Sequence, residues 1–167
     1  MLQHTPAVLV ALLGPLPEVM LSADEGPGTW SPVDILRHLV WCEVDDWIPR
    51  VRLIREHGTA QVFRPFDREA GFRRYANWQV PRLLDEFSRL RTANLLEIDQ
   101  LSLGATDLAA EGRHPQFGRV TLEQLLATWM THDLAHLTQV ARVLTKDSGR
   151  HIGPWRAYFS LLQDGSR

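Results

Sequence analysis

Residues 131–144 read THDLAHLTQVARVL, and this stretch decides the fold class that the sequence predicts. It holds no proline or glycine, and its apolar side chains recur every three or four residues, which is typical of an amphipathic helix. The same spacing continues upstream, so one stripe follows the whole helix. Its members are Leu122, Leu125, Trp129, His132, His136, Val140 and Val143. We expect a long helix that begins after a Thr121 cap, ends near Lys146 and turns this stripe toward a helical core.

Two members of the stripe, His132 and His136, are imidazoles where leucine would be expected. Side chains four residues apart on a helix lie about 6 Å apart at Cβ, close enough to aim at one metal ion. The alternative is a pair of core histidines satisfied by carbonyls or water. An unmatched buried polar group costs about 1–3 kcal/mol, and a divalent cation would use both nitrogen acceptors at once. The spacing alone leaves both interpretations open.

Three further helices are expected before this one. Their ranges are residues 5–21, interrupted near Gly14-Pro15, residues 32–57, and residues 80–101. Thr5 and Pro6 provide a cap and a first-turn proline for the first helix, and Ser31-Pro32 does the same for the second. Pro49 lies inside the second helix and predicts a kink near Trp47, because proline removes a backbone donor.

The connection over residues 58–77 is long and irregular, which indicates a crossover or a functional loop. Its arginines are Arg64, Arg68, Arg73 and Arg74, and Asp67 and Glu69 offset them. A solvated, partly paired loop is favoured over a site for an anionic ligand. A second loop spans residues 102–120, where no strand alternation is evident. The tail GPWRAYFSLL, residues 153–162, predicts a short helix that covers one end.

These elements together predict an all-α fold. The architecture is a four-helix bundle with a long crossover between helices 2 and 3, plus a short C-terminal helix. The chain has 167 residues, the usual size of one domain, so residues 1–167 are expected to form a single unit.

Composition excludes several classes of partner. Hydrophobic residues make up 44%, charged residues 23%, and the formal net charge is −2, so neither nucleic acid nor a membrane is an expected partner. The apolar N-terminal segment lacks a basic start and is broken by Gly14 and Pro15, which favours a core helix over a signal peptide. Cys42 is the only cysteine, which excludes an internal disulfide and fits a reducing compartment. We expect a cytoplasmic protein.

A third metal ligand is available in the second helix. His38 lies beside Ile35 and Cys42, at the edge of the apolar arc, from which a side chain can reach an inter-helix cavity. Cys42 itself could ligate a metal or act as a nucleophile, but a small core residue is favoured. The other histidines, expected at the surface, are His4, His57, His114 and His151.

The acidic residues near the candidate histidines are expected to have structural roles. Asp45 and Asp46 are expected on a solvated helix face. Asp133 lies about 100° around the helix from His132, so a surface acid or a structural ion pair is favoured over a role in orienting a histidine. The tryptophans Trp30, Trp78 and Trp129 could line a pocket, with core packing as the default. No residue is identified as a general base.

The chain resembles the DinB superfamily of metalloenzymes. The resemblance rests on WSPVDILRHLV at residues 30–40, on THDLAHLTQVARVL at residues 131–144, and on the order of the helices. It implies a four-helix bundle with a long connection between the second and third helices, a divalent metal held by three histidines, and a homodimer. The matching positions here are His38, His132 and His136. Characterised relatives include thiol-S-transferases and a thiol-dependent isomerase.

Three neutral imidazoles on a divalent ion leave coordination positions open, as in a catalytic site. Such positions can bind a thiol as thiolate or activate water. Imidazole suits zinc, nickel, copper and iron, with zinc or nickel expected first. The leading hypothesis is a metal-dependent transferase that joins a low-molecular-weight thiol to an electrophilic substrate. The alternatives are a non-catalytic metal-binding or stress-associated bundle protein and a metal-dependent hydrolase.

Overall fold

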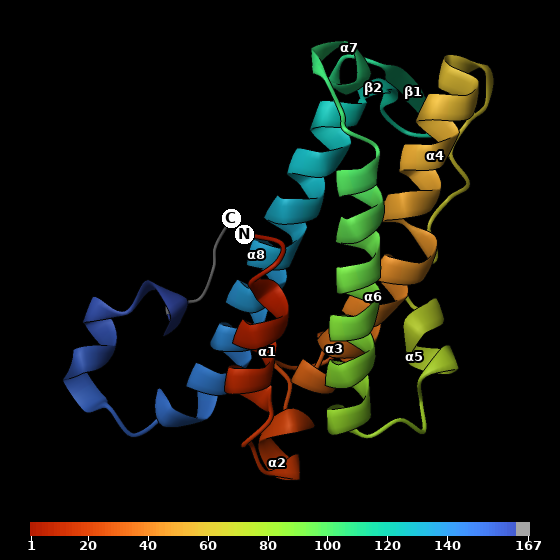
Figure 1. Cartoon of the computed structure of the whole chain (residues 1–167). Coiled ribbons are helices and arrows are strands. Elements are labelled where there is room, and N and C mark those ends of the chain that lie inside the picture. Colours follow the sequence, from red (N-terminus) through yellow and green to blue (C-terminus); the bar gives the residue numbers. More distant parts are fainter. Residues whose placement is uncertain (163–167) are drawn as a thin grey trace.

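The computed structural model describes residues 1–162 and has the predicted helical bundle as its frame (Figure 1). The long elements are α1 (Thr5–Leu13), α3 (Pro32–Asp45) continued by α4 (Trp47–His57), α6 (Val80–Gln100) and α8 (Leu122–Ser148). The α3–α4 pair and α6 rise toward one end of the bundle, while α1 and α8 run the opposite way. The fold class expected from the sequence is confirmed.

The second helical segment begins and bends where the sequence predicts. Ser31 and Asp34 form a capping box, in which the Ser31 hydroxyl accepts the Asp34 N–H at 3.3 Å and the Asp34 carboxylate accepts the Ser31 N–H at 3.4 Å. The segment then divides at Asp46 into α3 and α4. This break lies three residues before Pro49, whose missing N–H and ring prevent an undisturbed helix there. The kink predicted near Trp47 is therefore present.

The first segment is also divided, as Gly14-Pro15 predicts. After α1 the chain turns and forms the short α2 (Glu18–Leu21). His4 rather than Thr5 occupies the cap position of α1, and Pro6 lies in the first turn. The Thr5 hydroxyl instead donates to the Asp133 carboxylate at 2.6 Å, so this residue joins α1 to α8 rather than capping its own helix.

A long connection, residues 58–79, returns from the far end of α4 to the start of α6 along the side of the bundle (Figure 1). It contains η1 (Gly58–Ala60) and the short α5 (Ala70–Arg74), which packs on α3. The contact is close at Gly71, where an added Cβ would lie 2.5 Å from the Arg37 carbonyl oxygen. The expected crossover between helices 2 and 3 is present, with short helices inside it.

The expectation of a strandless loop over residues 102–120 is wrong. The segment forms α7 (Ala105–Leu108) and an antiparallel hairpin of β1 (Glu111–His114) and β2 (Gly118–Thr121), as a two-stranded sheet. The strands are four residues long and mostly polar, so side-chain alternation gives no signal, and backbone pairing decides the structure. The Phe63 N–H donates to the Arg113 carbonyl at 2.9 Å and attaches the 58–79 connection to the hairpin.

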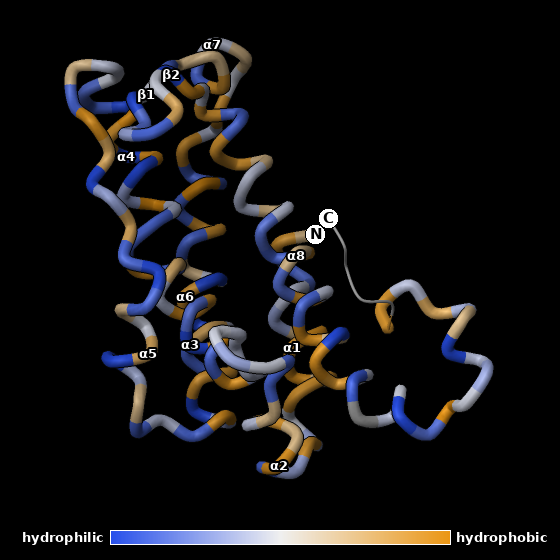
Figure 2. The backbone as a smooth tube through the Cα atoms, turned by 180° about the vertical axis from the view of Figure 1, so that it is seen from behind, coloured by the Kyte–Doolittle hydropathy of each residue, from blue (hydrophilic) through white to orange (hydrophobic). Residues whose placement is uncertain are grey.

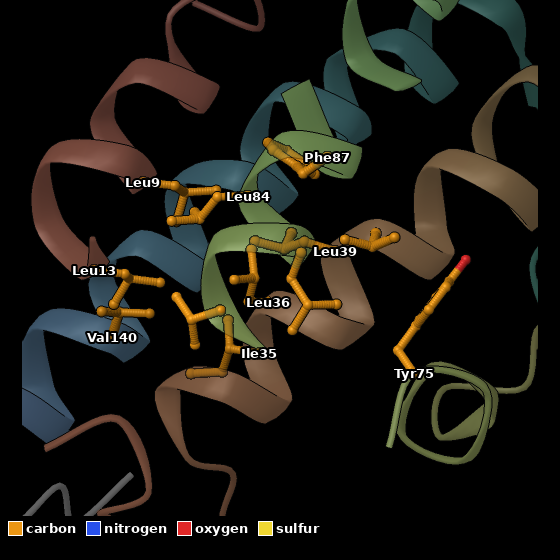
Figure 3. Close-up of a cluster of buried hydrophobic side chains, with 12 residues drawn as sticks. Leu9, Leu13, Ile35, Leu36, Leu39, Tyr75, Leu84, Phe87 and Val140 are labelled. Atoms are coloured by element: carbon orange, nitrogen blue, oxygen red, sulfur yellow. The ribbon is translucent and has the colours of Figure 1, made fainter. Parts of the chain in front are cut away.

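The core is built from the apolar stripes of all the long helices. Figure 2 shows hydrophobic and hydrophilic residues alternating turn by turn along the tube. Figure 3 shows Leu9 of α1 beside Leu84 of α6 and Leu13 of α1 beside Val140 of α8, and all four are buried. A second buried cluster includes Trp47, Val51, Leu122 and Trp129. Burial of these stripes provides the main driving force for the bundle.

The expected C-terminal helix takes the form of two short 3-10 helices, η2 (Gly153–Tyr158) and η3 (Ser160–Leu162). Figure 1 shows η2 extending away from the bundle, while η3 packs against the end of α8. Trp155 and Tyr158 are 64% and 83% exposed. Within residues 1–162, no helix combines the length and the apolar character needed to cross a membrane.

Candidate metal centre

Three histidines from two helices meet inside the bundle. His38 comes from α3, and His132 and His136 lie one turn apart on α8. The Nε2 atoms of His38 and His132 are 3.1 Å apart, and those of His132 and His136 are also 3.1 Å apart. All three ligand nitrogens lie within 4.8 Å of one another. These residues, called the histidine triad below, are the three that the sequence suggests as metal ligands.

Hydrogen bonds at the outer nitrogens orient two of the rings. His38 Nδ1 lies 3.0 Å from the Arg68 carbonyl oxygen, and His136 Nδ1 lies 2.9 Å from Gln139 Oε1. Because both oxygens can only accept, each Nδ1 carries the proton and each Nε2 presents a lone pair to the centre. His132 Nε2 can donate to only one of these lone pairs. The three ring nitrogens thus face one shared point, where the Cys42 thiol, 3.4 Å from His38 Nε2, is the other donor within reach.

This geometry fits a divalent ion. The 3.1 Å separations are close to about 3.3 Å, the edge of a tetrahedron with metal–nitrogen bonds of about 2.0–2.1 Å. Burial lowers the pKa of His38 to about 4 and that of His132 to about 2, and neighbouring positive charges add to this effect. The imidazoles are consequently neutral near pH 7, which is the form that binds metal. An outer carbonyl partner, as at His38, is the usual support of a ligating histidine.

Aromatic rings hold the histidine triad from several sides. Trp30 stacks on His136 with ring centroids 6.0 Å apart and planes 9° apart, and its ring lies 4.9 Å from His38. Trp47 meets His132 edge-on at 5.1 Å, and Phe66 meets His38 edge-on at 5.9 Å. These contacts restrict rotation of the imidazoles. Trp30 thus lies against the candidate ligands, while Trp129 is a buried core residue.

The histidine triad faces a cleft of about 660 Å³. Its walls come from α3, α4, the 58–79 connection, the β1–β2 hairpin and α8. Besides the triad, its lining residues include Asp46, Trp47, Arg50, Phe66, Arg68 and Phe117. Since this volume can admit a small molecule, the candidate centre is not closed by protein on every side.

Cys42 lies beside the triad but does not line the cleft. Its Sγ is 3.4 Å from His38 Nε2 and 4.0 Å from His132 Nε2, and its side chain is buried. Burial, followed by the negative charges of Asp46 and Glu43, raises the pKa of the thiol well above its usual value. Cys42 is therefore a neutral core residue, as the sequence favours, although it contacts two candidate ligands.

Asp46 was expected on a solvated helix face, and this expectation is wrong. The residue is 6% exposed, lies between α3 and α4, and lines the cleft. Its carboxylate is 2.7 Å from Arg50 Nε, and burial raises its pKa to about 6. Pro49 is the sequence signal that could have identified it, because the helix break turns Asp46 inward. Asp45 is partly exposed and pairs with Arg64.

A buried ion network lies behind the metal centre. Arg91 of α6 contacts Asp133 through Nη1 at 2.6 Å and Glu43 through Nη2 at 2.8 Å. The Trp129 indole N–H donates to Glu43 at 3.1 Å. Asp133 is thus a structural ion-pair residue, the favoured interpretation, but it is buried. The network fixes how α3, α6 and α8 face one another, and hence where Asp133's neighbour His132 points.

The remaining histidines lie apart from the triad. His4, His57 and His151 are exposed, as expected. His114 is half-buried in the hairpin, where its ring stacks on Phe117 at 4.5 Å and lines the cleft. His114 is thus partly exposed, and the unpredicted hairpin folds it over the cleft.

Comparisons with known proteins identify the family. The model of the DinB superfamily matches residues 1–140. YfiT from Bacillus subtilis, described as a probable metal-dependent hydrolase with an unusual four-helix bundle topology, has a TM-score of 0.68 and 22% identity over 84% of this chain and 82% of its own. The four-helix bundle protein TT2238 has a TM-score of 0.55 and 24% identity, covering 84% and 92%. No curated protein sequence matches the chain. At these identities the two structures show the fold alone, and the family match shows that the chain belongs to the DinB superfamily.

Proposed function

We propose that the histidine triad holds a divalent metal ion, zinc or nickel, and that the protein is a metal-dependent transferase joining a low-molecular-weight thiol to an electrophile. The observation that carries the proposal is the convergence of three Nε2 atoms, 3.1 Å apart in two pairs, beside an open cleft. Among the described residues, three imidazoles form the candidate ligand set and no fourth residue joins it. A small molecule entering the cleft can therefore reach it.

The bound ion would supply Lewis acidity that lowers the pKa of a thiol or water at its open positions. The protein residues prepare this site. The Arg68 carbonyl and the Gln139 amide hold the outer protons of His38 and His136, so that both rings present their lone pairs inward. Trp30 and Phe66 shield the rings from water, which keeps the imidazoles neutral and strengthens electrostatic interactions.

Hydrolysis is the second candidate function. It is favoured by the structural similarity to YfiT, which is described as a probable metal-dependent hydrolase. The same cleft can admit water, and Asp46 lines it with a pKa that burial raises to about 6. A carboxylate of this kind can accept a proton at neutral pH. The two candidates share the metal centre and differ in the nucleophile.

The first experiment measures metal content by mass spectrometry on protein purified without a histidine tag. We expect about one equivalent per chain in the wild type and its loss in His132→Ala. His57→Ala is the matched control, because this exposed histidine lies far from the triad and its loss should change nothing. Wild-type protein that takes up neither zinc nor nickel would exclude the metal centre.

The second experiment measures turnover by the metal-loaded protein. Conjugation of 2-mercaptoethanol to an aryl halide is compared with hydrolysis of an aryl ester, each with and without chelator. Conjugation that requires both metal and His132 supports the transferase. Metal-dependent ester hydrolysis without conjugation supports the hydrolase instead. Full metal occupancy with neither reaction, across a panel of thiols and esters, favours the non-catalytic metal-binding alternative.

A further inference from the structure

Arg68 is joined to the metal centre through its backbone. Its carbonyl oxygen accepts the Nδ1 proton of His38 at 3.0 Å, so the residue lies directly behind a candidate ligand. Its side chain is exposed and lines the cleft together with the whole histidine triad. One residue therefore orients a ligand with its main chain and presents a positive charge at the mouth of the same site.

A stack of rings holds the Arg68 guanidinium in place. The guanidinium carbon lies 5.2 Å from the centre of the Trp30 ring, and Trp30 in turn stacks on His136. Contact with an aromatic face stabilises an arginine while leaving its N–H groups able to bind an anion. The position of the charge relative to the triad is thus set by packing rather than by an ion pair.

The other arginines near this cleft already have partners. Arg64 pairs with Asp45, Arg73 with Asp67, and Arg50 with Asp46 at 2.7 Å. Arg74 lies over the Trp41 ring at 5.6 Å, as Arg68 lies over Trp30, but it does not line the cleft. Among the residues whose side chains the structure describes, Arg68 has no carboxylate at ion-pair distance. It is the cationic side chain of the cleft that remains available to a ligand.

The charge of Arg68 also reaches the metal centre. Arg68 lines the same cleft as all three histidines of the triad. A ligand bound at the centre therefore experiences this cation as well as the metal. The walls of the cleft include the aromatic side chains of Trp47, Phe66 and Phe117.

We propose that Arg68 is an anion-binding residue, and that the molecule which reaches the metal centre carries a carboxylate on a small, partly apolar body. This inference rests on the proposed metal centre and names the substrate class of that site. A guanidinium matches a carboxylate with two parallel hydrogen bonds, which orients the ligand while another group reaches the metal. The carboxylate belongs either to the thiol or to the second substrate, and the experiment separates these sources.

The test measures binding of matched probes to nickel-loaded protein by calorimetry and by the visible spectrum. The first pair is 3-mercaptopropionate and its neutral amide, and the second is a carboxylated alkyl hydroxamate and its amide. We expect the wild type to prefer a carboxylate about five- to ten-fold in at least one pair, since Arg68 is exposed and solvent weakens the interaction. A preference in the thiol pair assigns the carboxylate to the thiol. A preference in the hydroxamate pair alone assigns it to the second substrate.

Arg68→Gln should remove the preference while leaving nickel content and binding of the neutral amides unchanged, because the main-chain carbonyl remains. Arg82→Gln is the matched control: Arg82 also lies over a tryptophan, Trp78 at 3.6 Å, but does not line the cleft. The control should keep the full preference.

The outcomes separate this inference from the proposed function. Equal binding of the members of both pairs, a preference that survives Arg68→Gln, or failure of every probe to bind the nickel-loaded protein overturns the Arg68 subsite. If both thiols bind and neither pair shows a carboxylate preference, the Arg68 subsite is overturned while thiol activation at the metal centre stays intact. Conversely, an Arg68-dependent preference confined to hydroxamates, with no thiol bound, supports the subsite and argues against the transferase.

Discussion

The buried charge of Arg91 neutralises two buried carboxylates. Its guanidinium is 1% exposed and contacts Glu43 and Asp133, which are equally inaccessible. We expect Arg91→Met to lower the free energy of unfolding by about 3–5 kcal/mol, because two carboxylates would stay buried without a cation. Urea unfolding measures this loss. Arg89→Met, which breaks only an exposed pair with Glu86, should cost about 0.5 kcal/mol or less, and equal losses in the two variants would contradict the argument.

Asp46 should give stability a specific pH dependence. Burial raises its pKa from 3.8 to about 6 in the folded protein, although Arg50 opposes this effect. The folded state therefore favours the protonated carboxyl, whose contribution is complete below pH 3.8 and is lost as the pH rises through 6. Asp46→Asn stays neutral throughout. Relative to this variant, metal-free wild type should lose roughly 2–3 kcal/mol between pH 4 and 7 in urea unfolding. Parallel pH profiles would refute the assignment.

At the scale of elements, α5 holds the 58–79 connection against α3, just after the Arg68 carbonyl that contacts His38. An added Cβ at Gly71 would lie 2.5 Å from the Arg37 carbonyl oxygen and 2.9 Å from Trp41 Cβ, so α5 must move away from α3. We expect Gly71→Ala to lower the free energy of unfolding by about 1–3 kcal/mol. Because Arg68 precedes α5, we also expect about ten-fold weaker zinc binding in chelator competition.

Gly104→Ala, just before α7, is the control for Gly71→Ala, since the nearest atom to its added Cβ is 3.7 Å away. It should leave zinc affinity unchanged. If Gly71→Ala lost stability but bound zinc as tightly as the wild type, α5 would have no part in positioning the Arg68 carbonyl.

At the scale of the whole molecule, the bundle should not need the metal to fold. The buried apolar stripes of α1, α3, α6 and α8 form a continuous core apart from the histidine triad. We expect a chelator to leave the helical circular dichroism signal intact at 25 °C and to lower Tm by several degrees, because a bound ligand stabilises the folded state. His132→Ala should show no response to the chelator. Loss of helix on chelation would instead indicate a structural metal site.

Assembly is a second prediction at this scale. The family resemblance implies a homodimer, and the C-terminal segment leaves apolar side chains in solvent. Trp155, Tyr158, Phe159 and Leu161 are between 41% and 83% exposed. Exposed apolar groups gathered in one segment are typical of association surfaces. Light scattering should give twice the chain mass of 19.1 kDa, and a single-chain mass over a wide concentration range would exclude the dimer.

The sequence by itself determined the helical frame and the main candidates for the metal site. Periodic apolar residues, the Ser31 cap and the break before Pro49 act over a few residues, so the ends of the helices follow from local chemistry. His132 and His136 lie on one face because the helix repeat places them there. His38 lies at the edge of the apolar arc of its own helix, so the family resemblance, rather than its position, implies that it is the third ligand.

Only the tertiary structure decided which distant residues share the site. Asp46 reads as a surface acid, and Arg68 as one of several loop arginines, until the chain folds them around the same cleft. Glu43, Arg91 and Asp133 become a buried network only when α3, α6 and α8 pack together. The hairpin escaped prediction because its short, polar strands are stabilised by backbone pairing. Local periodicity records which face of an element is buried, whereas charge pairing and cleft lining depend on contacts between residues far apart in the sequence.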